Sequence, residues 1–198
     1  GEIVNGGGDY TITWNKWGIA ASNVKIELAT NGGAALPTYD KVIVANTANS
    51  GSYIWLASAL VSAVDNITPA ARVRVSDVND LDSANVSAAS FIIRAGFTLA
   101  PTIGSVPLEV GKTYDIVWTK KGNIAQVKLQ YSPDNFFADI RNIEDVNGLT
   151  IAGGLVLNKG DPLKGDGPTT GRHVWKVPDI EAINADTVRM RIADPNDP

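Results

Sequence analysis

Apolar and polar residues alternate along several short stretches of this chain. In one of them Val24, Ile26 and Leu28 alternate with Lys25 and Glu27. Since successive side chains of a β-strand point to opposite faces, this period of two predicts a strand with one buried face. Glycine, asparagine and aspartate gather between such stretches, at residues 31–33, 49–51 and 79–80. The pattern therefore predicts short antiparallel strands joined by tight turns.

The alternating segments occur twice, in the same order. Tyr-Thr-Ile-Thr-Trp at 10–14 returns as Tyr-Asp-Ile-Val-Trp at 114–118. The other matched segments are 24–28 with 127–131, 51–55 with 171–175, and 72–77 with 189–194. Such self-similarity indicates two copies of one domain. Short strands with regular turns in a copy of about 100 residues predict an all-β fold of two tandem antiparallel β-sandwiches.

The boundary between the copies is predicted near residues 94–101, which gives domains at 1–95 and 96–198. Residues 90–93 predict the last strand of the first copy, and residues 98–103 predict the first strand of the second. The first copy has no counterpart of 98–103 before Tyr10, and the second has no counterpart of 90–93. Two explanations stay open: the sequence is a window onto a longer array, or neighbouring subunits supply the absent strands.

The motifs of the two copies resemble a known family. They run Gly-x-x-Tyr-x-Ile-x-Trp, Val-x-Ile-x-Leu, Ser-Gly-x-Tyr-x-Trp, Arg-Val-x-Val-x-Asp and Ser-Phe-Ile-Ile. This order is similar to the Ig-like domain of the Kre9/Knh1 type, found in cell-wall proteins and in repeats of prokaryotic surface proteins. The resemblance implies Ig-like sandwiches in an extracellular, wall-associated or adhesive setting. It supplies no catalytic residue.

Composition and charge exclude several function classes. The net charge of −4, without a basic stripe, argues against a nucleic-acid partner. With no Cys and one His, thiolate zinc sites, Cys nucleophiles and His-pair metal sites are absent. No stretch approaches the roughly 20 apolar residues of a membrane span. The sequence therefore predicts no enzyme, no cofactor and no membrane insertion of this segment.

Most of the aromatic residues are predicted to be structural. Four tryptophans recur at matching places and are expected in the sandwich cores: Trp14, Trp55, Trp118 and Trp175. His173 stands where the first copy has Tyr53, which suggests a cross-strand aromatic role. Trp17 is matched by Lys121, and a position that accepts lysine is expected to be exposed. Trp17 is therefore a candidate for a subunit contact or for sugar stacking, the alternative being cover by its own loop.

Clustered carboxylates allow two interpretations, a calcium site or metal-free turns. Asp-Val-Asn-Asp at 77–80 recurs as Asp-Pro-Asn-Asp at 194–197. Oxygen ligands gathered in one loop suit Ca²⁺. Aspartate and asparagine also favour tight turns without any metal, because they hydrogen-bond to their own backbone. The spacing does not match an EF-hand loop, so the turn interpretation is favoured.

The second copy is longer than the first between its tryptophans, and an insertion at about 141–170 accounts for the difference. Two apolar runs flank Gly153-Gly154 and predict a β-hairpin. Its apolar residues are interface candidates: Leu149, Ile151, Leu155, Val156 and Leu157. The alternative is a hairpin that only lengthens its own sheet.

These observations favour a structural building block of an extracellular filament, surface layer or adhesin. Its expected partners are identical subunits or neighbouring repeats, bound through β-edges and apolar patches. The alternative is a carbohydrate-binding or cell-wall-glucan module, in which Trp17 or Phe136 stacks on sugar rings. The triplets at 66–68 and 85–87 fit the N-glycosylation acceptor pattern, which agrees with a cell-surface location.

Overall fold

The computed structural model describes residues 2–5, 9–16, 22–56, 67–100, 107–122, 124–179 and 188–196. This part of the chain is all-β, with two short 3₁₀ turns, η1 (Ala152–Gly154) and η2 (Pro162–Lys164). The chain divides into a first unit, Gly1–Gly96 with Lys121–Asn123, and a second unit, Phe97–Lys120 with Ile124–Pro198. Each unit is described by itself.

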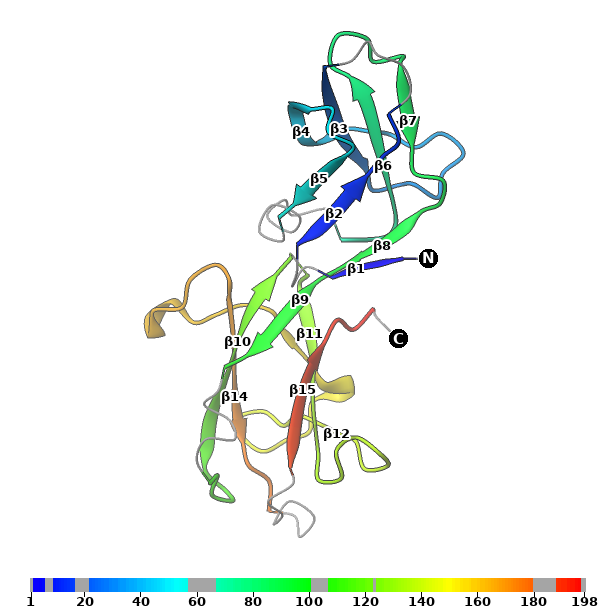
Figure 1. The fold of residues 1–198 in the computed structure, drawn as a ribbon. Coiled ribbons are helices and arrows are strands. Elements are labelled where there is room, and N and C mark those ends of the chain that lie inside the picture. Colours follow the sequence, from blue (N-terminus) through cyan, green and yellow to red (C-terminus); the bar gives the residue numbers. More distant parts are fainter. Residues whose placement is uncertain are drawn as a thin grey trace. The chain divides into compact units, whose positions relative to one another are not determined.

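The first unit consists of two sheets around one core (Figure 1). Its strands are β1 (Ile3–Asn5), β2 (Tyr10–Thr13), β3 (Asn23–Ala29), β4 (Lys41–Ala48), β5 (Ser52–Trp55), β6 (Thr68–Asp77), β7 (Ala84–Val86) and β8 (Phe91–Arg94). The larger sheet runs β1-β8-β6-β3-β4, with β7 also on β6, and the smaller sheet pairs β2 with β5. Ile12 and Trp55 of the small sheet and Ile26 and Leu28 of the large one are buried in the same core, which makes the unit a β-sandwich.

The second unit has a corresponding pair of sheets. Its strands are β9 (Gly96–Leu99), β10 (Thr113–Lys121), β11 (Gln126–Ser132), β12 (Arg141–Asn142), β13 (Leu155–Leu157), β14 (Thr170–Lys176) and β15 (Arg189–Ala193). One sheet runs β14-β10-β9, and in the other β11 pairs with β12, β13 and β15. Trp118 and Trp175 of the first sheet and Leu129 and Tyr131 of the second are fully buried in one core.

The repeated sequence segments pair in the same register in both units. The matching antiparallel pairs are Tyr10–Trp55 with Tyr114–Trp175, Ile12–Tyr53 with Ile116–His173, Ile26–Val75 with Leu129–Ile192, and Leu28–Val73 with Tyr131–Met190. A one-residue slip would move the apolar side chains to the other face of the sheet. The repeat read from the sequence is therefore a repeat of structure, residue by residue.

The sequence predicts no counterpart of residues 98–103 before Tyr10, and the strand that does precede Tyr10 is of another kind. Residues Ile3–Asn5 form β1, which lies parallel to β8 with Val4 opposite Ile93 (Figure 1). Three residues are enough because Val4 is buried among the core residues of the first unit. This strand lies on the large sheet, whereas β9 of the second unit lies on the sheet that contains β10. Strand β2 corresponds to β10. Among the described residues β2 pairs with β5 alone, whereas β10 pairs with both β14 and β9.

The predicted hairpin at 149–157 is wrong. Ala152–Gly154 forms the turn η1, and β13 pairs with β11 rather than with the apolar run before the two glycines. Val127 opposes Val156 just as Val24 opposes Thr47 on β4, so β13 is the counterpart of β4 and not an insertion. A Cβ atom at Gly154 would overlap the carbonyl oxygen of Leu129. Gly154 thus serves a close approach to β11, not a hairpin turn.

The larger part of the extra length lies further along the chain. Asn49 is separated from Gly51 by Ser50 alone, whereas its counterpart Asn158 is separated from Gly171 by residues 159–170. This segment contains η2 and is found only in the second unit.

Candidate functional site

An asparagine caps a tryptophan in each unit. The Trp14 indole Nε1 donates to Asn49 Oδ1 at 2.8 Å, and Trp118 Nε1 donates to Asn158 Oδ1 at 2.9 Å. The backbone N–H of each asparagine also donates a hydrogen bond to a carbonyl just before a strand. Asn49 bonds Ser22, before β3, and Asn158 bonds Ala125, before β11. These tryptophans are structural, because their polar atom is satisfied inside the unit. Sequence reasoning missed the two asparagines. The sequence feature that could have identified them is their shared position: Asn49 directly follows β4, the partner of β3, and Asn158 directly follows β13, the partner of β11.

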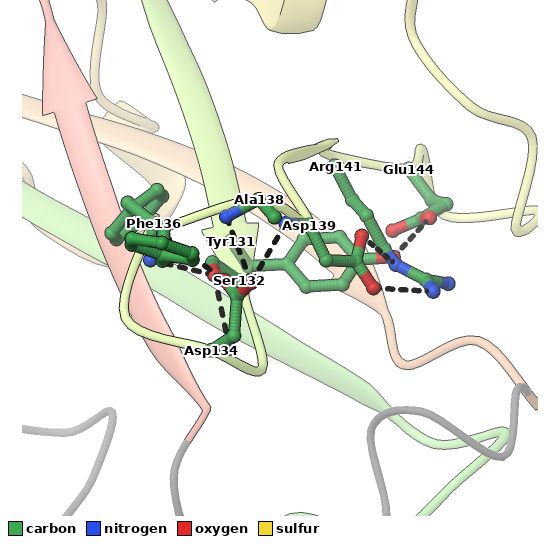
Figure 2. Close-up of polar contacts among 9 residues, drawn as sticks. Tyr131, Ser132, Asp134, Phe136, Ala138, Asp139, Arg141 and Glu144 are labelled. Carbon is green, nitrogen blue, oxygen red and sulfur yellow. Dashed lines mark hydrogen bonds and ion pairs between the residues drawn. The ribbon is translucent and has the colours of Figure 1, made fainter.

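A buried carboxylate organises the core of the second unit. Glu144 accepts hydrogen bonds from Tyr131 Oη at 2.8 Å and from Trp175 Nε1 at 2.7 Å (Figure 2 shows the Tyr131 contact). His173 Nε2 lies 2.7 Å from the backbone carbonyl of Glu144, which fits the structural role predicted for this histidine. Burial, reinforced by the Glu144 carboxylate, raises the pKa of Tyr131. Since both carboxylate oxygens of Glu144 are bonded within the core, the cluster stabilises the fold and offers no exposed acid.

A second carboxylate shapes the loop after β11. Asp134 accepts hydrogen bonds from the Ser132 hydroxyl and from the backbone N–H groups of Phe137, Ala138 and Asp139, at 2.6 to 3.2 Å (Figure 2). The Ser132 bond, together with those from the backbone, lowers the pKa of Asp134 to about 2. The loop, residues 132–139, is therefore held by its own ionised carboxylate.

This loop presents one aromatic ring to solvent. Asn135 and Phe136 have positive φ angles of 60° and 64°, which L-residues rarely adopt. The Arg191 guanidinium lies over the Phe136 ring at 4.6 Å and leaves it half-buried, whereas Phe137 is 92% exposed. Phe137, and not the predicted Phe136, is thus the accessible aromatic residue here.

Acid should loosen the 132–139 loop. A carboxyl group with a lowered pKa in the folded chain stabilises the fold above its ordinary pKa of 3.8 and loses that effect as the pH falls toward 2. We expect hydrogen-exchange protection of residues 135–139 to fall between pH 4 and pH 2. Asp134→Asn should remove this protection already at pH 7, because an amide nitrogen cannot accept the backbone bonds. Residues 23–29 of the first unit serve as the control, and equal losses there would contradict the prediction.

Ion pairs hold the extra segment of the second unit against the sandwich. Arg172 donates to both carboxylate oxygens of Asp166, at 2.6 and 2.7 Å, and to Asp115 at 2.9 Å. Lys164 also bonds Asp115, at 2.7 Å. The Arg172 guanidinium lowers the pKa of Asp166 to about 2. The turn η2 is thereby fixed, and it carries Leu163, which is 97% exposed.

The predicted interface candidates divide into two groups. Val156 is buried in the core of the second unit and Ile151 packs half-buried against it, so neither offers a contact surface. Leu149, Leu155 and Leu157 are exposed. Leu155 and Leu157 point away from the core because they alternate with Val156 along β13. Trp17 lies outside the described residues.

The aspartate turns bond their own backbone. In each turn a carboxylate accepts from the backbone N–H two residues ahead, in the pairs Asp77–Asn79, Asp80–Asp82 and Asp194–Asn196. This is the geometry of tight turns without metal. Within the described ranges, no group of three metal-ligating side chains is close enough to hold an ion. Asp197 lies outside those ranges.

Neither a protein-family model nor a curated protein matches this chain. No helix in the described part of the chain is long and apolar enough to cross a membrane.

Proposed function

We propose that this chain is a non-catalytic structural building block of an extracellular filament, surface layer or adhesin. The observation that carries the proposal is the duplicated framework, in which the same strands pair in the same register in both units. In stacked repeats each copy adds length in a regular way. The resemblance to Ig-like Kre9/Knh1-type domains supports the same role and the cell-surface location.

The second unit offers the contacts for assembly with identical subunits or neighbouring repeats. Two of its loops hold large apolar side chains in water: Phe137 on the 132–139 loop and Leu163 on η2. Leu155 and Leu157 add two exposed leucines on the outer face of β13. Exposed apolar groups on a rigid framework are typical of protein contact sites. Rigid spacing, β-edge pairing and burial of these groups are the proposed mechanism.

Charged residues on the outer face of β13 should weaken assembly. We expect the wild-type chain to form ordered filaments or sheets in electron micrographs. Leu155→Asp with Leu157→Asp should raise the protein concentration needed for assembly about tenfold or more, because each leucine contributes apolar burial. Leu36→Asp, at a residue 87% exposed in the first unit, is the matched control. Isolated particles of the wild-type chain at every concentration would contradict the proposal.

The alternative function is carbohydrate binding, which the exposed Phe137 ring favours. A ring held on a fixed loop can stack on the apolar face of a sugar. In that case Phe137→Ala should weaken binding to cell-wall polysaccharide about threefold to tenfold. Leu163→Ala is the control, since it removes an equally exposed side chain without a ring. Pull-down on a panel of insoluble glucans measures the effect, and absence of wild-type binding would exclude this function.

A further inference from the structure

Two segments cover the outer edge of β6 in the first unit. Strand β8 pairs antiparallel with one end of β6, where Phe91 opposes Ala71 (Figure 1). Strand β7 pairs with the other end, where Asn85 opposes Val75. The inner edge of β6 pairs with β3. Both edges of this strand are therefore satisfied by main-chain partners.

The covering strand also completes the core of the first unit. Phe91 and Ile93 of β8 are buried, and the Phe91 ring stacks on Tyr10 at a centroid distance of 6.3 Å. Ala71, beneath this strand, is fully buried. Removing β8 would therefore expose apolar side chains as well as a strand edge.

Strand β15 is the counterpart of β6, and the described residues pair with one of its edges only. It pairs with β11 in the register that β6 has with β3. Among residues 107–122, 124–179 and 188–196, none pairs with its other edge. Val188 and Met190 correspond to Ala71 and Val73. Both are half-buried, whereas Ala71 and Val73 are buried.

We propose that the outer edge of β15 is an acceptor site for a β-strand with the apolar pattern of β8, donated by a further repeat unit. The incoming strand runs antiparallel to β15 and places large apolar residues at two alternate positions, as Phe91 and Ile93 do in the first unit. The β8 strand of this chain is not the donor, because it is buried in its own unit. Main-chain bonds would supply affinity and the two apolar side chains would supply register. This inference rests on the proposed function and names the partner that one edge receives.

A peptide that copies residues 81–95 tests the site, since it contains both β7 and β8. We expect a fluorescently labelled peptide to bind the full chain saturably, measured by anisotropy. Hydrogen exchange of residues 188–193 should slow on binding, whereas that of residues 68–77 should stay unchanged. A peptide with Phe91→Asp and Ile93→Asp should bind at least about tenfold more weakly, because it loses two buried apolar side chains.

A covalent version removes the dependence on peptide affinity. Residues 81–95 appended after Pro198 raise the local concentration of the strand. We expect this extension to protect residues 188–193 from exchange and to raise the melting temperature of the chain, and the Asp-substituted extension to do neither. If the extension protects residues 188–193 and the free peptide does not, the site exists but binds a separate strand weakly. Failure of both peptide and extension would overturn the site. A chain that still assembles in micrographs would then retain the proposed function without this edge.

Discussion

Replacing Gly171 with alanine is expected to destabilise the second unit strongly. A Cβ atom at this position would overlap the indole ring of Trp118, which is fully buried and cannot move away. Overpacking of this kind costs about 3 kcal/mol of unfolding free energy, which lowers the melting temperature of a 100-residue unit by roughly 10–20 °C. Tryptophan fluorescence during thermal unfolding measures the effect, and hydrogen exchange of residues 113–121 assigns it to the second unit.

Gly167 provides the matched control for that substitution. An added Cβ atom there meets no atom within 4 Å. Gly167→Ala should therefore change the unfolding free energy by no more than about 0.5 kcal/mol. Equal effects of the two substitutions would show that Gly171 is not needed for the approach of β14 to Trp118.

Replacing Glu144 with alanine is the second change with a large expected effect. It removes the acceptor of two buried donors, the Tyr131 hydroxyl and the Trp175 indole N–H. Each donor left without a partner costs about 1–3 kcal/mol, so we expect a loss of about 2–4 kcal/mol once the relief of burying a carboxylate is included. Urea denaturation measures it. The control is Glu109→Ala, at an exposed position.

A double substitution separates the lost hydrogen bond from other damage at Glu144. Tyr131→Phe removes the hydroxyl that Glu144→Ala leaves without an acceptor. The cost of Tyr131→Phe should therefore be smaller in the Glu144→Ala background than in the wild-type chain, by about 1 kcal/mol. Strict additivity of the two changes would contradict the hydrogen-bond explanation.

The repeated strands and the all-β fold were accessible to sequence reasoning, and the reason is duplication. A period of two marks a half-buried strand, and two copies of the same four segments reduce the chance of a false match. A sequence pattern does not reveal the parallel pairing of a segment as short as Ile3–Asn5. The position of this segment depends on one buried side chain, that of Val4.

The error at 149–157 has a different cause. A Gly-Gly pair signals either a hairpin turn or a close approach of two backbones, and composition does not distinguish them. Here Gly154 lies against the Leu129 carbonyl. Aligning Asn158 with Asn49 would have identified Leu155–Leu157 as the counterpart of β4. Residues 159–170 are then the extra length of the second copy.

The features of the candidate contact surface were the least predictable. Phe136 and Phe137 are identical neighbours in sequence, and Arg191, which is far along the chain, decides which ring is covered. Similarly, Leu163 is exposed because Arg172, Asp115 and Lys164 fix the turn beneath it. Such contacts depend on the tertiary arrangement and leave no local pattern.

The shared register has a consequence for folding. Two units with interchangeable strands offer each other competing partners while both are unfolded, and domain-swapped misassembly is a known failure of tandem repeats. The Glu144 cluster discriminates against it. In a sheet that exchanged its central strands, Leu28 would replace Tyr131, and the Glu144 carboxylate would face methyl groups instead of a hydroxyl donor. The Glu144 carboxylate, found in the second unit, thus makes the wrong pairing less stable than the right one, which lets each of two similar units fold on its own core.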